Sequence, residues 1–133
     1  MDKKIIIHIP HASLKLPNIF YQRILIDKEQ LEKENIFVSD YLVDKLISNQ
    51  TKNIIKFNYS RLFCDVERFK DDDLEIMSKV GMGAIYEKDS NGNNFIKYDL
   101  KYKNLVLTKH YDKYHDDINQ KVDNLLNKYG DVI

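Results

Sequence analysis

The hydrophobic pattern begins with two strands separated by a helical region. Four isoleucines within residues 5–9 form a β-branched run that Pro10 ends, which predicts a buried, central strand over residues 4–9. Alternating apolar positions predict a second strand over residues 53–59. Strand, helix and strand make a β-α-β unit, so we expect the two strands to lie parallel and to end at the same edge of a sheet.

Two helical segments are expected between these strands. The first covers residues 18–35 in one or two pieces, with Asp27 as the cap of residues 28–34, whose charges are expected to face solvent. The second begins at Ser39, whose hydroxyl is placed to cap a helix over residues 40–47. The side chains of this helix that are expected to face the core are Leu42, Val43, Leu46 and Ile47.

The segment after the second strand is polar and rich in turns. We expect the acidic residues within 71–75 to form a solvent-facing turn. Gly81 and Gly83 permit a tight backbone path, but they lack the third glycine of a dinucleotide-binding fingerprint. Residues 84–86 and 95–98 are predicted to pair as a hairpin around an Asn-Gly tip.

One long helix is predicted over residues 102–129, followed by Gly130 as a stop signal. On this helix His115 lies at the edge of the apolar stripe, where it either packs or serves a site, and His110 is turned away. Residues 131–133 are expected to begin another strand. The apolar stripe consists of Leu107, Tyr111, Tyr114, Ile118, Val122, Leu125 and Tyr129.

Length and composition favour one domain over residues 1–133, with no internal repeat, linker or low-complexity segment. The chain has 21 basic and 21 acidic side chains, so no net charge favours nucleic acid or an anionic membrane as a partner. Cys64 is the only cysteine, which excludes an internal disulfide and fits a reducing, cytoplasmic compartment. The apolar run at residues 5–9 is too short for a signal peptide or a membrane span.

Residues 60–69 are the first candidate for chemistry, because two arginines and two acids alternate there with apolar side chains. One interpretation is a strand end that directs its charges to a site, and the other is a surface strand with weak ion pairs. The side chains expected to be buried are Leu62, Cys64 and Val66, and those expected to point elsewhere are Arg61, Asp65 and Glu67.

His11 is the second candidate, since it follows the first strand directly. Open α/β sheets bind their ligands at the carboxyl ends of strands, so this histidine is either a site residue or a loop residue bonded to the backbone. Asp40, at the start of the predicted second helix, either complements the helix dipole or belongs to the same site.

Five short motifs, in this order, resemble the N-formylglutamate amidohydrolase family. They are Ile7-His8-Ile9-Pro10-His11-Ala12-Ser13, Ser39-Asp40 ahead of Val43-Asp44-Lys45-Leu46, Ser60-Arg61 with Asp65-Val66-Glu67-Arg68-Phe69, Gly81-Met82-Gly83, and Tyr111 with Tyr114-His115. The family's usual Pro-His-Ser-Gly stands here as Pro-His-Ala-Ser. Its frequent Asp-x-Asn-Arg has Glu67 in place of the amide, a change that bears on the substrate.

The resemblance implies a three-layer α/β/α fold with a mainly parallel sheet, similar to zinc-dependent exopeptidases and short at its C-terminal end. It implies hydrolysis of a linear amide such as an N-formyl or N-acyl amino acid, with N-formylglutamate giving formate and glutamate. His11 and Asp40 would then bind Zn²⁺, which polarises a carbonyl and activates water. It further implies catalytic roles for Glu67, Arg68 and His115, and substrate contacts from Ser13, Arg61 and Tyr111.

Members of the family are longer, and after the long helix they carry a strand with an Asp-x-His-Ser motif that supplies a further ligand. The sequence here ends at Ile133, so two hypotheses stand. In one, the chain is a metal-dependent amidohydrolase in which His115 or another chain completes the site. In the other, it is an inactive remnant that binds a small carboxylate or serves assembly, and an exposed sheet edge pairs two copies.

Overall fold

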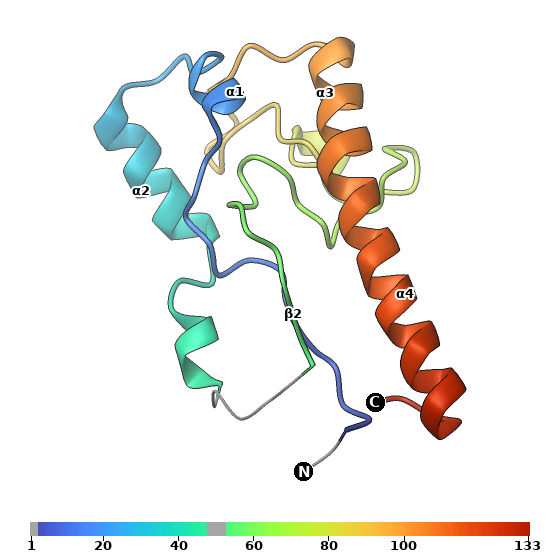
Figure 1. The fold of residues 1–133 in the computed structure, drawn as a ribbon. Coiled ribbons are helices and arrows are strands. Elements are labelled where there is room, and N and C mark those ends of the chain that lie inside the picture. Colours follow the sequence, from blue (N-terminus) through green and yellow to red (C-terminus); the bar gives the residue numbers. More distant parts are fainter. Residues whose placement is uncertain (1–2, 48–52) are drawn as a thin grey trace.

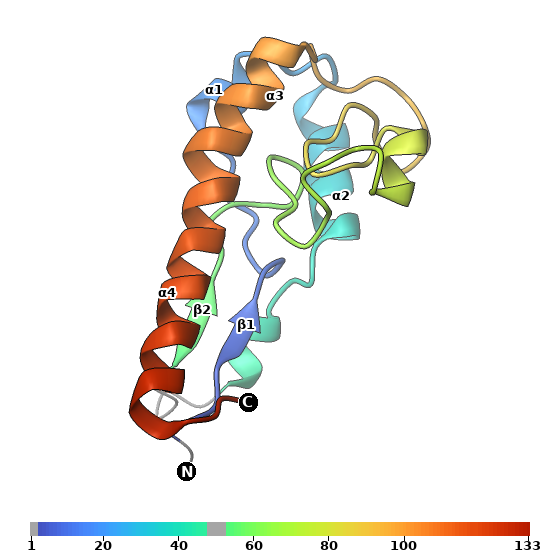
Figure 2. The same ribbon diagram turned by 90° about the vertical axis from the view of Figure 1, so that its right-hand side faces the viewer.

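The computed structural model describes residues 3–47 and 53–133 and shows a small parallel sheet between two layers of helices (Figure 1). One layer holds the second helix and a 3₁₀ turn, and the other holds the long C-terminal helix (Figures 1 and 2). This arrangement confirms the α/β class. The elements are β1 (Ile7–Ile9), α1 (Asn18–Tyr21), α2 (Lys28–Val38), η1 (Val43–Leu46), β2 (Ile54–Lys56), η2 (Ile76–Val80), α3 (Leu100–Val106), η3 (Leu107–Tyr111) and α4 (Asp112–Tyr129).

The predicted parallel pair of strands is confirmed. β1 and β2 lie in register with Ile7 opposite Ile54 and Ile9 opposite Lys56. Each strand is shorter than the sequence pattern predicts, although the Phe57 N–H still donates to the Ile9 carbonyl at 3.1 Å. Beyond Ile9 the fixed backbone angle of Pro10 ends the pairing and turns the chain toward the site.

The chain's last residue pairs with the other side of β1. The N–H of Ile133 donates to the Lys4 carbonyl at 2.9 Å, and the N–H of Ile6 donates to the Ile133 carbonyl at 2.8 Å. This is the bond pattern of parallel neighbours, and it lies opposite β2 because successive residues of a strand point their main-chain groups to opposite sides. The two bonds agree with the start of another strand after Gly130, but they involve residues 4 and 6, which precede β1, and the sheet of the described residues has two strands. The expectation of a buried strand is wrong except at Ile9, because Ile7 is only partly buried and His8 is exposed.

The helix capped by Asp27 is confirmed as α2. The Asp27 carboxylate accepts from the Gln30 N–H, and the Gln30 side chain accepts from the Asp27 N–H, so both form a capping box. The expectation that the charges of this segment face solvent is wrong for Glu34. That side chain is buried, and it accepts hydrogen bonds from the N–H and the hydroxyl of Ser90.

The helix predicted over residues 40–47 is wrong. Leu42 has a left-handed backbone (φ 69°), which interrupts any helix from Ser39 and leaves only the 3₁₀ turn η1. Leu42, Val43 and Leu46 are exposed rather than in the core, Leu46 to 83%. The Ser39 hydroxyl is buried without a hydrogen-bond partner among the described residues and caps no helix.

The long C-terminal helix is confirmed, with one irregularity. The Asp99 carboxylate caps its start by accepting from the Tyr102 N–H at 2.8 Å, and Gly130 ends it with a φ of 79°. Residues 107–111 form a π-helical turn, which holds more residues than an α turn and so rotates the side chains around it. His110 is therefore half-buried against Tyr59 and Phe63, and the expectation that it points away is wrong.

The segment between β2 and α3 is mostly irregular and partly buried. The predicted hairpin is confirmed only at its Asn-Gly tip, where Lys88 and Asn94 form an antiparallel bridge. The predicted pairing of residues 84–86 with 95–98 is wrong, because Ile96 bridges to Ile24 and Tyr86 to Met82. The acidic turn is also not wholly exposed, because Glu75 is buried. Its carboxylate accepts from the main-chain N–H groups of residues 69 and 77, so it organises this loop.

No helix within residues 3–47 and 53–133 is long and apolar enough to cross a membrane.

Candidate functional site

A buried aspartate, Asp65, lies at the centre of the candidate site. The chain reaches it through a turn rather than a strand, in which the Ser60 carbonyl accepts from the N–H groups of Phe63 and Cys64. The expected burial of Leu62, Cys64 and Val66 and the exposure of Glu67 are confirmed, but the expectation that Asp65 points outward is wrong, because Asp65 is fully buried. The lone Cys64 is a buried core residue, and burial raises the pKa of its thiol.

Both carboxylate oxygens of Asp65 accept several hydrogen bonds. Oδ1 accepts from His11 Nε2 at 2.8 Å and from the Glu67 N–H at 3.2 Å. Oδ2 accepts from Arg61 Nη2 at 2.7 Å and from the Tyr86 hydroxyl at 3.0 Å. Burial alone would raise the pKa of Asp65, but the hydrogen bond from His11 and the charge of Arg61 outweigh it and hold the pKa well below its usual range.

His11 is oriented by this carboxylate. An ionised carboxylate can only accept hydrogen bonds, so Nε2 of His11 carries the hydrogen, and in the neutral ring Nδ1 keeps its lone pair. Nδ1 faces two exposed carboxylates, Asp40 Oδ2 at 3.8 Å and Glu67 Oε2 at 3.6 Å. Both distances are too long for hydrogen bonds. A carboxylate behind a histidine in this way is typical of metal-binding histidines.

Asp40 is brought to the site by its backbone. Its N–H donates to the His11 carbonyl at 2.9 Å, which ties the segment after α2 to the end of β1. The two residues given as metal ligands by the family resemblance therefore lie side by side. The helix-dipole interpretation of Asp40 is wrong, because no helix begins there.

The two arginines share one carboxylate but differ in what remains available. Arg61 uses Nε and Nη2 on Asp65 and Nη1 on the Val38 carbonyl at 3.2 Å. Arg68 Nε lies 3.5 Å from Asp65 Oδ2, is buried and makes no hydrogen bond within the described residues. Arg68 Nη1 lies 3.7 Å from the Glu75 carboxylate, so most donors of this arginine remain for a ligand.

His115 and Tyr111 reach the same loop from the long helix. His115 Nε2 donates to the Val66 carbonyl at 2.8 Å, and its ring stacks on Tyr111 with centroids 4.3 Å apart. The Tyr111 hydroxyl donates to the Arg68 carbonyl at 2.7 Å. Both residues therefore hold the 66–68 segment in place, and His115 Nδ1 remains as an acceptor.

Ser13 lies in the loop after β1, and its hydroxyl donates to the Asn58 carbonyl at 2.8 Å. This bond joins the exits of β1 and β2 and uses the only hydrogen of the hydroxyl. The oxygen also accepts from the Lys15 N–H at 3.2 Å. A substrate contact by Ser13 stays a prediction.

The donor types of the site fit zinc, but their number is smaller than a catalytic site needs. His11 Nδ1 and the carboxylate of Asp40 offer the nitrogen and oxygen ligands that Zn²⁺ accepts, which makes two protein ligands. In the part of the chain that the structure describes, no group of three or more His, Cys, Asp or Glu side chains is gathered so as to hold a metal ion. Catalytic zinc commonly has three protein ligands.

Sequence reasoning placed His11, Arg61 and Glu67 together but missed the central role of Asp65 and the presence of Tyr86. Burial and the adjacent Asp65 carboxylate raise the pKa of Tyr86 to about 12, so this hydroxyl stays protonated and donates a hydrogen bond to Asp65. Asp65 is the acid of an Asp-x-x-Arg motif, and this motif could have marked it as a site residue. Nothing in the sequence near Tyr86 marked it, because it lies in an irregular segment far along the chain.

Replacing Tyr86 with phenylalanine is expected to lower the free energy of unfolding by about 1–2 kcal/mol, because the buried Asp65 carboxylate loses one donor. Urea denaturation followed by circular dichroism measures this. Tyr114→Phe is the matched control, since the Tyr114 hydroxyl is buried and has no hydrogen-bond partner among the described residues. An equal loss in both variants would show that the Tyr86 bond contributes nothing particular.

The fold and site define an α/β protein whose polar site is built at the carboxyl ends of two parallel strands, around a carboxylate-oriented histidine. The sequence profile of the N-formylglutamate amidohydrolase family matches residues 3–133. The chain therefore belongs to the N-formylglutamate amidohydrolase family.

Among solved structures, the chain is similar to the N-formylglutamate amidohydrolase of Ralstonia eutropha JMP134, with a TM-score of 0.80 and 15% sequence identity. The similarity covers 97% of this chain and 51% of that protein, so this chain spans about half of its length. At this identity the likeness supports the fold alone. A search of curated proteins found no match.

Proposed function

We propose that this chain carries the catalytic residues of an amide hydrolase that converts N-formylglutamate, or a closely related N-acyl amino acid, into the free acid and the amino acid. The observation that supports this most is His11, held by the buried Asp65 carboxylate at 2.8 Å with its other nitrogen toward Asp40 and Glu67. Membership of the family supplies the reaction class.

His11 and Asp40 would hold the metal ion, for which Zn²⁺ suits their imidazole and carboxylate donors. When bound, such an ion polarises the substrate carbonyl and activates a water molecule. A third protein ligand would come from His115, whose Nδ1 is free of the Val66 bond, or from another chain.

The remaining side chains of the site would act on the attacking water or contact the substrate. Glu67, whose side chain is 52% exposed, would act as the general base that takes a proton from the attacking water. Arg68 has donors to spare for the substrate carboxylate or the oxyanion, in the planar geometry that suits such groups. The unused N–H groups of Arg61 and the ring of Tyr111 would complete the wall of the pocket.

A second candidate is a catalytically inactive module that binds a small carboxylate. It is favoured by the lack of a three-ligand group within residues 3–47 and 53–133. This candidate predicts binding of N-formylglutamate without bound metal and without turnover. Isothermal titration calorimetry with this ligand, beside the formate assay below, separates the two functions.

Replacing His11 with alanine is expected to remove stoichiometric zinc from the dialysed chain and to abolish formate release from N-formylglutamate, because the proposed site loses one of its few ligands. Mass spectrometry of the metal content and an enzymatic formate assay measure the two effects. His110→Gln is the control, since His110 packs against Tyr59 and Phe63 outside the site. Unchanged zinc in the His11 variant would exclude this residue as a ligand.

A further inference from the structure

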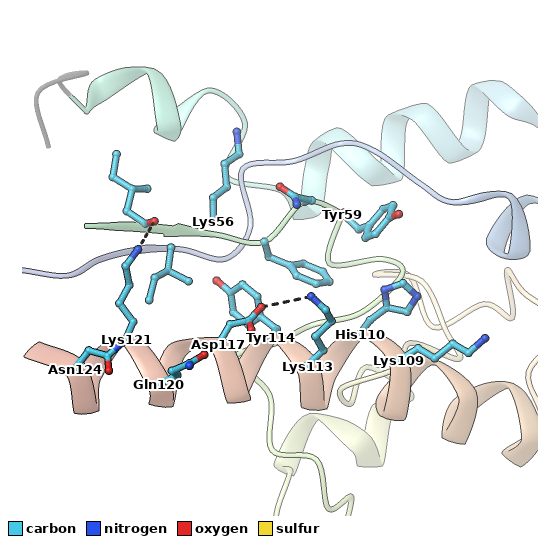
Figure 3. Close-up of a pocket in the computed structure, with 14 residues that line it drawn as sticks. Lys56, Tyr59, Lys109, His110, Lys113, Tyr114, Asp117, Gln120, Lys121 and Asn124 are labelled. Carbon is cyan, nitrogen blue, oxygen red and sulfur yellow. Dashed lines mark hydrogen bonds and ion pairs between the residues drawn. The ribbon is translucent and has the colours of Figure 1, made fainter. Parts of the chain in front are cut away.

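A groove of about 650 Å³ lies between β2 and the long helix, and none of the candidate site residues lines it (Figure 3). One wall is the strand and its continuation, residues 54–59, and the other is the helix face from Lys109 to Asn124. Buried aromatic side chains lie at its base, where the rings of Phe57 and Tyr114 meet with centroids 5.1 Å apart.

The groove is positively charged in a chain that has no net charge. Three lysines of the helix, Lys109, Lys113 and Lys121, line it, and Asp117 is the one acid among the lining residues. The Lys56 ammonium points away from the helix (Figure 3) and is paired with Asp44, so it adds no charge to the groove. Asp117 lies 3.7 Å from the Lys113 ammonium, at the surface, where such pairs are weak. The cations therefore outnumber the anion along this face of the helix.

The strand wall presents main-chain groups to the groove. In β2 and at its ends the odd-numbered residues bond to β1, so the N–H and carbonyl groups of residues 54 and 56 point the other way. The Ile54 carbonyl accepts a long bond of 3.4 Å from Lys121, and the Asn58 carbonyl accepts from Ser13. Lys56 thus turns both main-chain groups toward the groove.

The charges on the helix match the repeat of an extended chain. Positions 113, 117 and 121 recur every four residues of α4, which is about 6 Å along an α-helix, and position 109 precedes them in the π-helical turn η3. Alternate side chains of a β-strand are spaced by about 6.6 Å. A strand laid in the groove would therefore set every second side chain beside a position of this row, three of which are lysines.

We propose that the groove binds an extended acidic segment of a partner protein, which adds as a strand to the open edge of β2. Its main chain pairs with the groups around Lys56, Asp or Glu side chains face Lys109, Lys113 and Lys121, and a neutral residue lies opposite Asp117. The aromatic base supplies apolar contact area, and the lysine row supplies selectivity for acidic sequences. This function is independent of hydrolysis at His11.

Fluorescence anisotropy of the whole chain with a labelled peptide TETETTTET, which has threonine opposite Asp117, tests the proposal. We expect saturable binding, no binding of TKTKTTTKT, and about tenfold weaker binding by Lys113→Glu. Lys101→Glu is the matched control, because it makes the same change of charge at an exposed position outside the groove. An unaffected Lys113→Glu variant would overturn the proposal.

Two further measurements separate strand addition from simple charge attraction. A TETETTTET peptide with alternate backbone nitrogens methylated keeps its charge but loses the donors that pair with β2, so it should bind at least about tenfold more weakly. Equal binding of the methylated peptide, or full competition by free glutamate, would show that the groove binds a small anion rather than an added strand, and would overturn the proposal. Dimerisation of the chain alone that Lys113→Glu abolishes would assign the groove to a second copy and overturn the proposal.

Discussion

Replacing Asp65 with asparagine is expected to lower the free energy of unfolding by about 3–5 kcal/mol, because it leaves a buried charge without its partner. Asp65 accepts from His11, Arg61 and Tyr86 at once, and no other acid lies within hydrogen-bond distance of the Arg61 guanidinium among the described residues. The asparagine amide has the same shape as the aspartate carboxylate, but its NH₂ group would face hydrogen-bond donors of the surrounding residues. This is a large part of the roughly 5–15 kcal/mol by which domains are stable.

Urea denaturation at neutral pH measures this loss. Glu32→Gln is the control, since it removes the same charge from an exposed pair with Lys28 that lies 3.7 Å apart on α2. That variant should stay within about 1 kcal/mol of the parent chain. A loss of similar size in the two variants would mean that Asp65 is not the electrostatic centre of the fold.

The same carboxylate gives the fold a defined dependence on pH. Because the pKa of Asp65 is lower in the folded chain than in the unfolded chain, its contribution is fully present above about pH 4 and is lost as the pH falls toward the lowered value. The difference in stability between the parent chain and Asp65→Asn should therefore shrink between pH 5 and strongly acidic pH. A difference that stays constant would contradict the lowered pKa.

The sequence was sufficient for the parts of the fold that depend on regular periodicity. The β-branched run before Pro10 and the apolar stripe of the long helix each specify one face, and both elements were confirmed. The parallel pairing followed, since a helix between two strands requires a crossover. His11 was placed correctly at the end of β1 for the same reason.

Periodicity failed where side chains rather than regular backbone decide the path. A two-residue alternation around Asp65 predicted an outward carboxylate, but the segment is a turn in which successive side chains are buried on several sides. Asp65 can be buried because the Arg61 guanidinium balances its charge and His11 donates a hydrogen bond to it, and these partners are 4 and 54 residues away in the sequence. Such compensation between distant residues leaves no local pattern.

The failed helix after Ser39 matters for the site. A helix over residues 40–47 would satisfy its own backbone, whereas the observed turn frees the Asp40 N–H to bond the His11 carbonyl. The apolar side chains that the pattern assigned to the core, such as Leu46, are exposed in consequence. The local preference for helix is therefore overridden by the main-chain link that brings Asp40 to His11.

Glu67 is where this chain departs most clearly from the family pattern, which has an amide at this position. Replacing Glu67 with glutamine is expected to reduce formate release from N-formylglutamate by about 10²–10⁴-fold, the usual effect of losing a general base. The side chain is half exposed and lies 3.6 Å from His11 Nδ1, so it can reach a water molecule held beside that nitrogen. Zinc content should be unchanged, since His11 and Asp40 remain.

Glu67→Asn distinguishes a role of the Glu67 carboxylate as general base from a role in selecting the substrate by charge. If Glu67 is the base, asparagine is as inactive as glutamine. If its negative charge instead repels the carboxylates of N-formylglutamate, asparagine should raise kcat/KM for this substrate, and the assignment as base is then wrong. Glu32→Gln, on the exposed face of α2, should leave the formate assay unaltered. Comparing the three variants at equal zinc content therefore ties any loss of turnover to the Glu67 carboxylate itself.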